Sequence, residues 1–129
     1  MTRDQKLAIL AYEHVKRIKE LDPEKQKEYR TLVQGLGPLV LRSGLVTALA
    51  FLQRKRKGRE STPANLLFKH LAEADIPGLR VEQPDEVADQ LCEHTRHLDL
   101  EETMLATRHL LKVVEWLKRA VEATLREDG

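Results

Sequence analysis

The stretch DLEETMLATRHLLKVVEWLKRAVEATL, residues 99–125, decides the fold class of this chain. Its apolar residues recur mostly at steps of three and four, so they form one stripe along a long α-helix, and Asp99 is a suitable N-cap. The stripe consists of Met104, Thr107, Leu110, Leu111, Val114, Leu117, Val121 and Leu125. A helix with one apolar stripe must bury it against other elements, so the rest of the chain has to cover it.

Helical spacing also dominates the remaining chain. Apolar stripes lie at residues 7–21, 29–40, 45–52, 66–74 and 87–91. Capping residues and prolines that suit a helix start precede or open these segments. They are Thr2 with Gln5, Asp22–Pro23, Thr62–Pro63 and Pro84–Asp85. Since no alternating run long enough for a sheet appears, we predict an all-α fold, a compact bundle of about five to seven helices. We expect residues 1–129 to form a single domain.

The second stripe carries three residues that disfavour a regular helix. They are Gly35, Gly37 and Pro38. Because a proline inside a helix removes one backbone hydrogen bond, we predict a kink or a break at this point.

We expect five large side chains to lie in the core, since each falls on an apolar stripe. They are Tyr29, Leu32, Leu49, Phe51 and Trp116. Truncating a buried side chain of this kind costs about 2–5 kcal/mol.

Composition limits the class of protein. The chain has 129 residues, 41% hydrophobic and 33% charged, and its formal net charge is +1. These values are typical of a soluble globular protein, and no run of apolar residues is long enough for a membrane span. Residues 1–6 are charged where a signal peptide would be apolar, and Cys92 is the single cysteine. We therefore expect a cytoplasmic protein.

The charges are unevenly distributed. Residues 1–60 carry 14 Lys or Arg and 7 Asp or Glu, whereas residues 61–129 carry 8 and 14. The strongest local feature is RKRKGR, residues 54–59, which holds five cations and no acid. Such a run favours contact with phosphates, and the alternative is a solvated helix end stabilised by the helix dipole. With aromatic residues at only 4%, base stacking is not favoured.

We find no motif for catalysis or nucleotide binding in the sequence. The best metal candidate is the group Cys92, Glu93, His94, His97 and Glu101. The predicted helix boundary near Leu98–Asp99 would separate these ligands, so we predict no metal site and no cofactor.

The other histidines, His14, His70 and His109, are scattered in the sequence, and no motif pairs them with a nucleophile. We expect a buried, inert thiol at Cys92 and a protein that is not an enzyme. A metal-dependent nuclease that uses His94 and His97 is the catalytic alternative.

Three central segments and two near the ends of the chain carry a family resemblance. YRTLVQGL (residues 29–36), Pro38–Leu39–Val40 and SGLVTALAFL (residues 43–52) resemble the central stretch of the small subunit of type III-B CRISPR–Cas effector complexes, the Cmr complexes. Ala11–Tyr12–Glu13 and WLKRAVEA (residues 116–123) resemble the two ends of the same family. The family more often has Asn where Ser43 stands and has its proline one position before Pro38, which affects the expected kink geometry.

The resemblance implies a non-catalytic helical subunit of an RNA-guided antiviral ribonucleoprotein. Copies of such a subunit stack as a short filament beside the backbone subunits and line the groove that holds CRISPR RNA and target RNA. The expected partners are therefore those subunits, further copies of this chain, and the two RNAs, with no membrane. The alternative function is a free-standing helical adaptor or nucleic-acid-binding protein unrelated to CRISPR.

On this interpretation, the RNA backbone is contacted by cations of the basic first half. They are Arg42, Arg54, Lys55, Arg56, Lys57 and Arg59.

Overall fold

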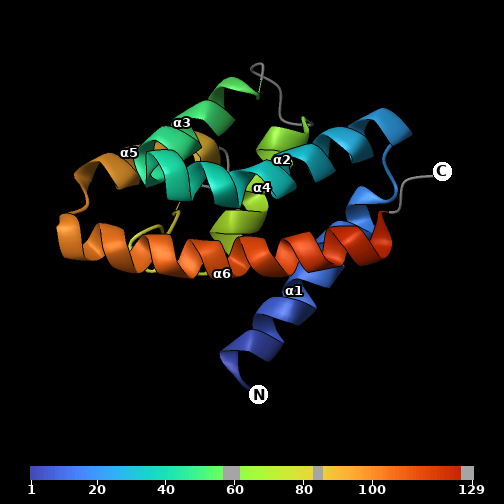
Figure 1. The fold of residues 1–129 in the computed structure, drawn as a ribbon, viewed down its shortest axis with the longest axis horizontal. Helices are drawn as coiled ribbons and strands as arrows, with labels where there is room; N and C mark the ends of the chain where they lie inside the picture. The colour runs from blue at the N-terminus through green and yellow to red at the C-terminus, as the bar shows by residue number, and fades with distance from the viewer. Residues whose placement is uncertain (57–61, 83–85, 126–129) are drawn as a thin grey trace.

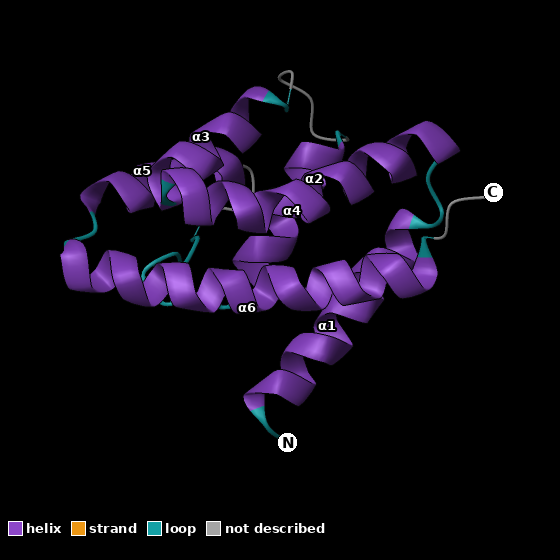
Figure 2. Cartoon of the chain, viewed as in Figure 1, coloured by secondary structure: helices purple, strands orange, loops and turns teal. Residues whose placement is uncertain are grey.

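The structure is a computed structural model that describes residues 1–56, 62–82 and 86–125. Six helices follow one another in this part of the chain, and it contains no strand (Figures 1 and 2). They are α1 (Arg3–Ile18), α2 (Pro23–Ser43), α3 (Leu45–Arg54), α4 (Pro63–Glu73), α5 (Val87–His97) and α6 (Leu100–Thr124). The predicted all-α bundle is confirmed. None of the described helices is both long and apolar enough to cross a bilayer.

The starts of α1, α2, α4 and α6 are those that the capping residues predict, whereas the start predicted at Pro84–Asp85 lies outside the described residues. Thr2 and Gln5 form a capping box at the start of α1, and Asp99 and Glu102 form another at the start of α6. Asp22 accepts a hydrogen bond from the backbone N–H of Lys25, 2.9 Å away, at the start of α2. Each cap satisfies backbone donors that a helix leaves unpaired in its first turn.

Helix α2 does not break where glycine and proline predicted it. It continues through Pro38 and ends at Gly44, which has a φ of +90°. Leu36 and Val40, on either side of the proline, are both buried. Their packing outweighs the one backbone hydrogen bond that Pro38 cannot donate. Gly37 faces α6, where a Cβ would lie at the ordinary contact distance of 3.8 Å from the Val114 side chain, so this packing does not require glycine.

Helix α2 connects two groups of helices. On one side α1 and α2 both pack against α6, the long helix that crosses the foreground of Figure 1. On the other side α2 packs against α3 and α4, and α5 packs against α3 and α4. The buried residues of all six helices form one continuous apolar core.

The five side chains expected in the core have three different environments. Tyr29 and Leu49 are fully buried, whereas Leu32 and Trp116 are half-buried and pack against the core from outside. The prediction for Phe51 is wrong, because its side chain is 37% exposed. On α3, Ala48, Leu49 and Leu52 take the inward face, which turns Phe51 toward the rim.

Urea unfolding of alanine variants tests the difference in burial between Leu49 and Phe51. Leu49→Ala should lower the free energy of unfolding by about 2–5 kcal/mol, since it opens a cavity in the core. Phe51→Ala should lower it by about 1 kcal/mol or less, because the ring is already partly in water. Equal losses for the two variants would contradict this assignment of the faces of α3.

Candidate nucleic-acid interface

The end of α3 presents two of the predicted cations at the surface. Arg54 and Lys55 are exposed. The Arg54 guanidinium carbon lies 5.6 Å, and the Lys55 ammonium 5.2 Å, from the centroid of the Phe51 ring. Cations at a helix C-terminus interact favourably with the helix dipole, and an aromatic face adds a second attraction. This helix end is therefore a defined cationic surface.

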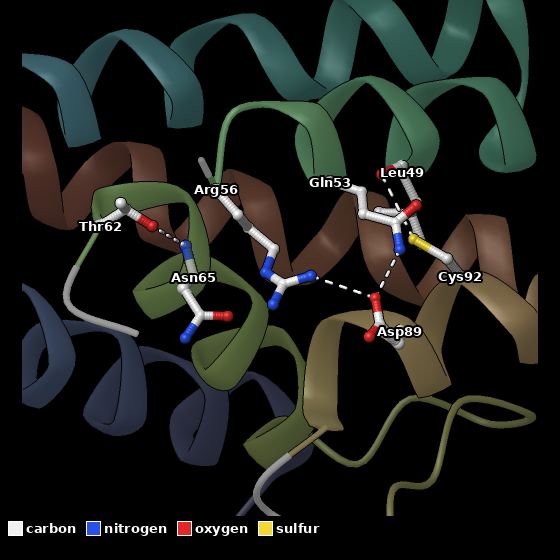
Figure 3. Close-up of polar contacts among 7 residues, drawn as sticks. All are labelled: Leu49, Gln53, Arg56, Thr62, Asn65, Asp89 and Cys92. Atoms are coloured by element: carbon white, nitrogen blue, oxygen red, sulfur yellow. Dashed lines mark hydrogen bonds and ion pairs between the residues drawn. The ribbon is translucent and has the colours of Figure 1, made fainter. Parts of the chain in front are cut away.

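Arg56 faces inward from the same segment. Its Nη1 donates to Oδ1 of Asp89 on α5 at 3.1 Å, and Gln53 Nε2 donates to the same oxygen at 2.7 Å (Figure 3). The Arg56 Nε is buried without a hydrogen-bond partner in the described part of the protein. The guanidinium thus joins α3 to α5 and differs from its two exposed neighbours. The sequence could not show this, because the run offers no sign of which cation faces Asp89.

Arg42 and Lys55 lie on the same groove. The groove is about 610 Å³ in volume, and α2 and α3 form its walls. Its floor is apolar, with Leu32, Leu36, Leu39, Phe51 and Leu52, and its polar edge consists of Glu24, Lys27, Glu28, Thr31, Arg42 and Lys55. The structure therefore brings Arg42 to the same surface as the α3 end. The last two predicted cations, Lys57 and Arg59, lie outside the described residues.

The structure brings only part of the group weighed as metal ligands together: Glu93, His94 and His97 line one cleft, whereas Cys92 and Glu101 do not line it. The Cys92 thiol is buried and donates a hydrogen bond to the carbonyl oxygen of Leu49 at 3.4 Å (Figure 3). Burial raises the pKa of this thiol to about 11. His94 and His97 instead line a cleft of about 510 Å³, and Glu101 belongs to the next helix. Within the described ranges, no group of three or more His, Cys, Asp or Glu is placed to hold a metal ion.

The scattered histidines include one buried pair that the sequence did not reveal. The rings of His14 on α1 and His70 on α4 stack with centroids 4.0 Å apart. Nδ1 of His70 lies 2.7 Å from the Tyr29 hydroxyl of α2, so three helices meet at this cluster. Helix α1 is too far from α4 in sequence for any local spacing to indicate this contact.

The electrostatics of this cluster keep its groups neutral. The pKa of His70 is lowered to about 3, first by burial and then by the nearby His14, Arg17 and Lys69. Burial also lowers the pKa of His14, although Glu73, whose Oε2 lies 3.1 Å from His14 Nε2, acts in the opposite direction. Burial raises the pKa of Tyr29, so its hydroxyl stays protonated where it is hydrogen-bonded to Nδ1 of His70.

A bundle of six helices with a cationic helix end beside an apolar groove places the described part of the chain among the small all-α proteins. The family model described as "CRISPR-associated protein (Cas_Cmr5)" matches residues 3–124. The chain belongs to this Cmr5 family. The resemblance drawn from the sequence is thereby confirmed, and the alternative of an adaptor unrelated to CRISPR is not supported.

Similar proteins cover nearly the whole chain. "CRISPR system Cmr subunit Cmr5" of Thermus thermophilus is 31% identical over 126 residues, which are 98% of each chain. The protein of the same name from Thermotoga maritima is 26% identical over 108 residues, or 84% of this chain and 75% of the relative. The crystal structure of a CRISPR-associated Cmr5 family protein from Thermus thermophilus superposes with a TM-score of 0.76. It is 29% identical and covers 98% of this chain and 99% of its own.

The buried histidine pair makes stability depend on pH. The unfolded chain takes up a proton on His70 below about pH 6.5, whereas the folded protein resists protonation until about pH 3. The free energy of unfolding should therefore fall as the pH is lowered between these values, by up to about 1.4 kcal/mol per pH unit for this one group.

The slope of the free energy of unfolding against pH, compared between wild type and a His70 variant, separates the contribution of His70 from that of the carboxylates. His70→Gln should flatten the slope between pH 6 and pH 5, as measured by urea unfolding at each pH. His97→Gln, which removes an exposed histidine from α5, should leave the slope as it is. Identical slopes for wild type and His70→Gln would show that the pair does not resist protonation.

Proposed function

We propose that this chain is a non-catalytic small subunit of a type III-B CRISPR ribonucleoprotein effector complex. It stacks with further copies as a short filament beside the backbone subunits and helps to hold guide and target RNA in antiviral defence. The observation that carries this proposal is the family match over residues 3–124, together with curated relatives that are named as Cmr subunits. The cytoplasm is the compartment in which such a complex would act.

The RNA contact that we propose is made to phosphates. Arg54 and Lys55 are exposed at the end of α3, and Arg42 lies on the adjoining groove. Lys57 and Arg59 follow Arg56 in the sequence and are part of the same proposal. Point charges of this kind neutralise phosphates without reading bases, which suits a subunit that must accept any guide sequence. Arg56 is assigned a structural role, because Asp89 already pairs with its guanidinium.

The environment of the reactive side chains supports a role without catalysis. His14 and His70 are stacked on each other inside the protein, and Tyr29 already occupies one nitrogen of His70. The Cys92 thiol, with its pKa raised to about 11, is protonated at neutral pH and therefore a poor nucleophile.

The acidic second half supports contact with protein partners. The cleft beside α5 is lined by the carboxylates of Glu82, Glu86, Glu93 and Glu102 as well as by two histidines. Such a surface attracts a basic protein segment and repels RNA. We therefore assign this side to neighbouring subunits and the α3 end to RNA.

Charge reversal at the α3 end tests the RNA contact. The double variant Arg54→Glu/Lys55→Glu should weaken the capture of target RNA by the assembled complex about tenfold, because two phosphate contacts become repulsive. Filter binding at fixed salt measures the loss, and thermal unfolding of the isolated subunit should show only a small decrease, because two favourable charges leave a helix C-terminus.

The matched control is Lys16→Glu/Lys19→Glu, which reverses two exposed cations near the end of α1. It changes the net charge by the same amount and should leave capture near the wild-type value. Equal capture by both double variants and wild type would remove the α3 end from the RNA interface.

Membership of the complex can be tested by purification from the native host. The tagged chain should recover partner subunits and short RNAs that share a repeat-derived tag. Recovery of the chain alone, or with mixed cellular RNA, would contradict the proposed function.

A further inference from the structure

The groove between α2 and α3, called here the α2–α3 groove, leaves apolar side chains uncovered. Phe51 is 37% exposed, and Leu32 and Leu39, on the facing helix, are half-buried. Helices α2 and α3 diverge from the turn at Gly44 (Figure 1), and side chains of both helices line the groove between them. Exposed apolar surface with a polar edge is typical of a docking site for another protein surface.

A complementary ridge lies at the start of α6. Leu100, Met104 and Leu105 are 76%, 56% and 42% exposed, which is unusual for large apolar side chains. Met104 stands one helical turn after Leu100, and Glu101, Leu105 and Arg108 continue the same outward side. The Asp99–Glu102 capping box holds this first turn in helical form. We call these residues, Leu100–Leu105 with Arg108, the α6 ridge.

The ridge and the groove of one molecule do not lie together. In Figure 1 the first turn of α6 lies at the left edge below α5, whereas α2 and α3 diverge toward the upper right. Two complementary surfaces at separate places on one chain can meet only between copies. Such a contact is heterologous, and it continues from copy to copy as an open stack.

We propose that the α6 ridge of one copy docks into the α2–α3 groove of the next copy. This inference rests on the proposed function and deepens it, since it names the two surfaces by which copies stack. Met104 seats against Phe51, where a thioether and an aromatic ring attract each other. Leu100 and Leu105 cover the leucines of the groove floor and remove them from water.

The charges of the two surfaces set the direction of docking. Arg42 is the charged groove residue toward the C-terminal end of α2, whereas Glu24, Lys27 and Glu28, of mixed sign, lie toward its N-terminal end. On the ridge Glu101 precedes Met104 and Arg108 follows it. With Glu101 toward Arg42 this pair is of opposite sign, whereas the reverse direction brings Arg108 toward Arg42 and opposes like charges.

Docking in this way also places the RNA contact at each junction. Arg54 and Lys55 flank Phe51, so the seam between two copies runs beside them. A stack would therefore repeat the cationic helix end at regular intervals, as contact with a long RNA backbone requires.

Disulfide trapping between two variants of the isolated chain tests the contact. Phe51→Cys and Met104→Cys are mixed under mild oxidation, and the mixed dimer is followed on non-reducing gels. The native Cys92 is buried, with its pKa raised to about 11, so it does not compete. The mixed dimer should form about tenfold faster than with the control pair Phe51→Cys and Ile9→Cys, because docking raises the effective concentration of the thiols.

The control position is comparable, since Ile9 on α1 is also a large exposed apolar side chain. All three cysteines replace exposed residues, and circular dichroism verifies that the variants stay folded. Equal rates for the two pairs, or faster reaction of the control pair, would overturn the inference.

A charge swap tests the direction. Arg42→Glu or Glu101→Lys, each placed in the appropriate cysteine variant, should slow trapping, and the two together should restore it. Slowing without restoration would overturn the proposed direction.

The trapping experiment can fail without contradicting the proposed function, and the two results can be told apart. If trapping shows no preference while the tagged wild-type chain still recovers Cmr subunits, the docking inference fails and the subunit role stands. A cross-link from Phe51→Cys to a different subunit within the purified complex would assign the groove to that subunit and would also overturn the inference.

Discussion

The burial of the α6 stripe is the constraint on which the rest of the structure depends. A helix of 25 residues with one continuous apolar stripe is stable only when that stripe is covered, and α1 and α2 supply the cover. Since α2 also carries α3 and α4 on its other side, its unbroken course through Pro38 joins the two groups of helices into one core.

Polar contacts between helices help to fix how the helices are aligned. The buried Tyr29–His70–His14 cluster connects α2, α4 and α1, and the Arg56–Asp89 pair at the surface connects α3 to α5. A polar group inside a protein must find its partner, so the buried cluster selects one arrangement from several of similar apolar burial. The same contacts position the end of α3, and with it the exposed Arg54 and Lys55.

The helices themselves could be read from the sequence because their signals are local. A capping residue acts on backbone groups within its own first turn, as Asp99 does, and apolar spacing reports one face of one helix. The predictions from sequence were wrong where the environment of a residue depends on residues that are distant in the sequence but close in space. Phe51 follows the apolar pattern but lies at the edge of the face, and the predicted break at Pro38 yields to packing on both sides of α2. In the sequence Arg56 does not differ from the cations beside it. In the structure it pairs with Asp89, 33 residues later.

The all-helical class, the helix starts and the family follow from the chain alone, because each rests on patterns within one helix or on recognisable segments. The tertiary structure alone decided which cations stay exposed, which aromatic ring stays exposed, and that two distant histidines stack. These outcomes depend on contacts between helices far apart in the sequence. The free energy of such contacts is set by burial and by the partners that the fold brings together, and neither is encoded in local spacing.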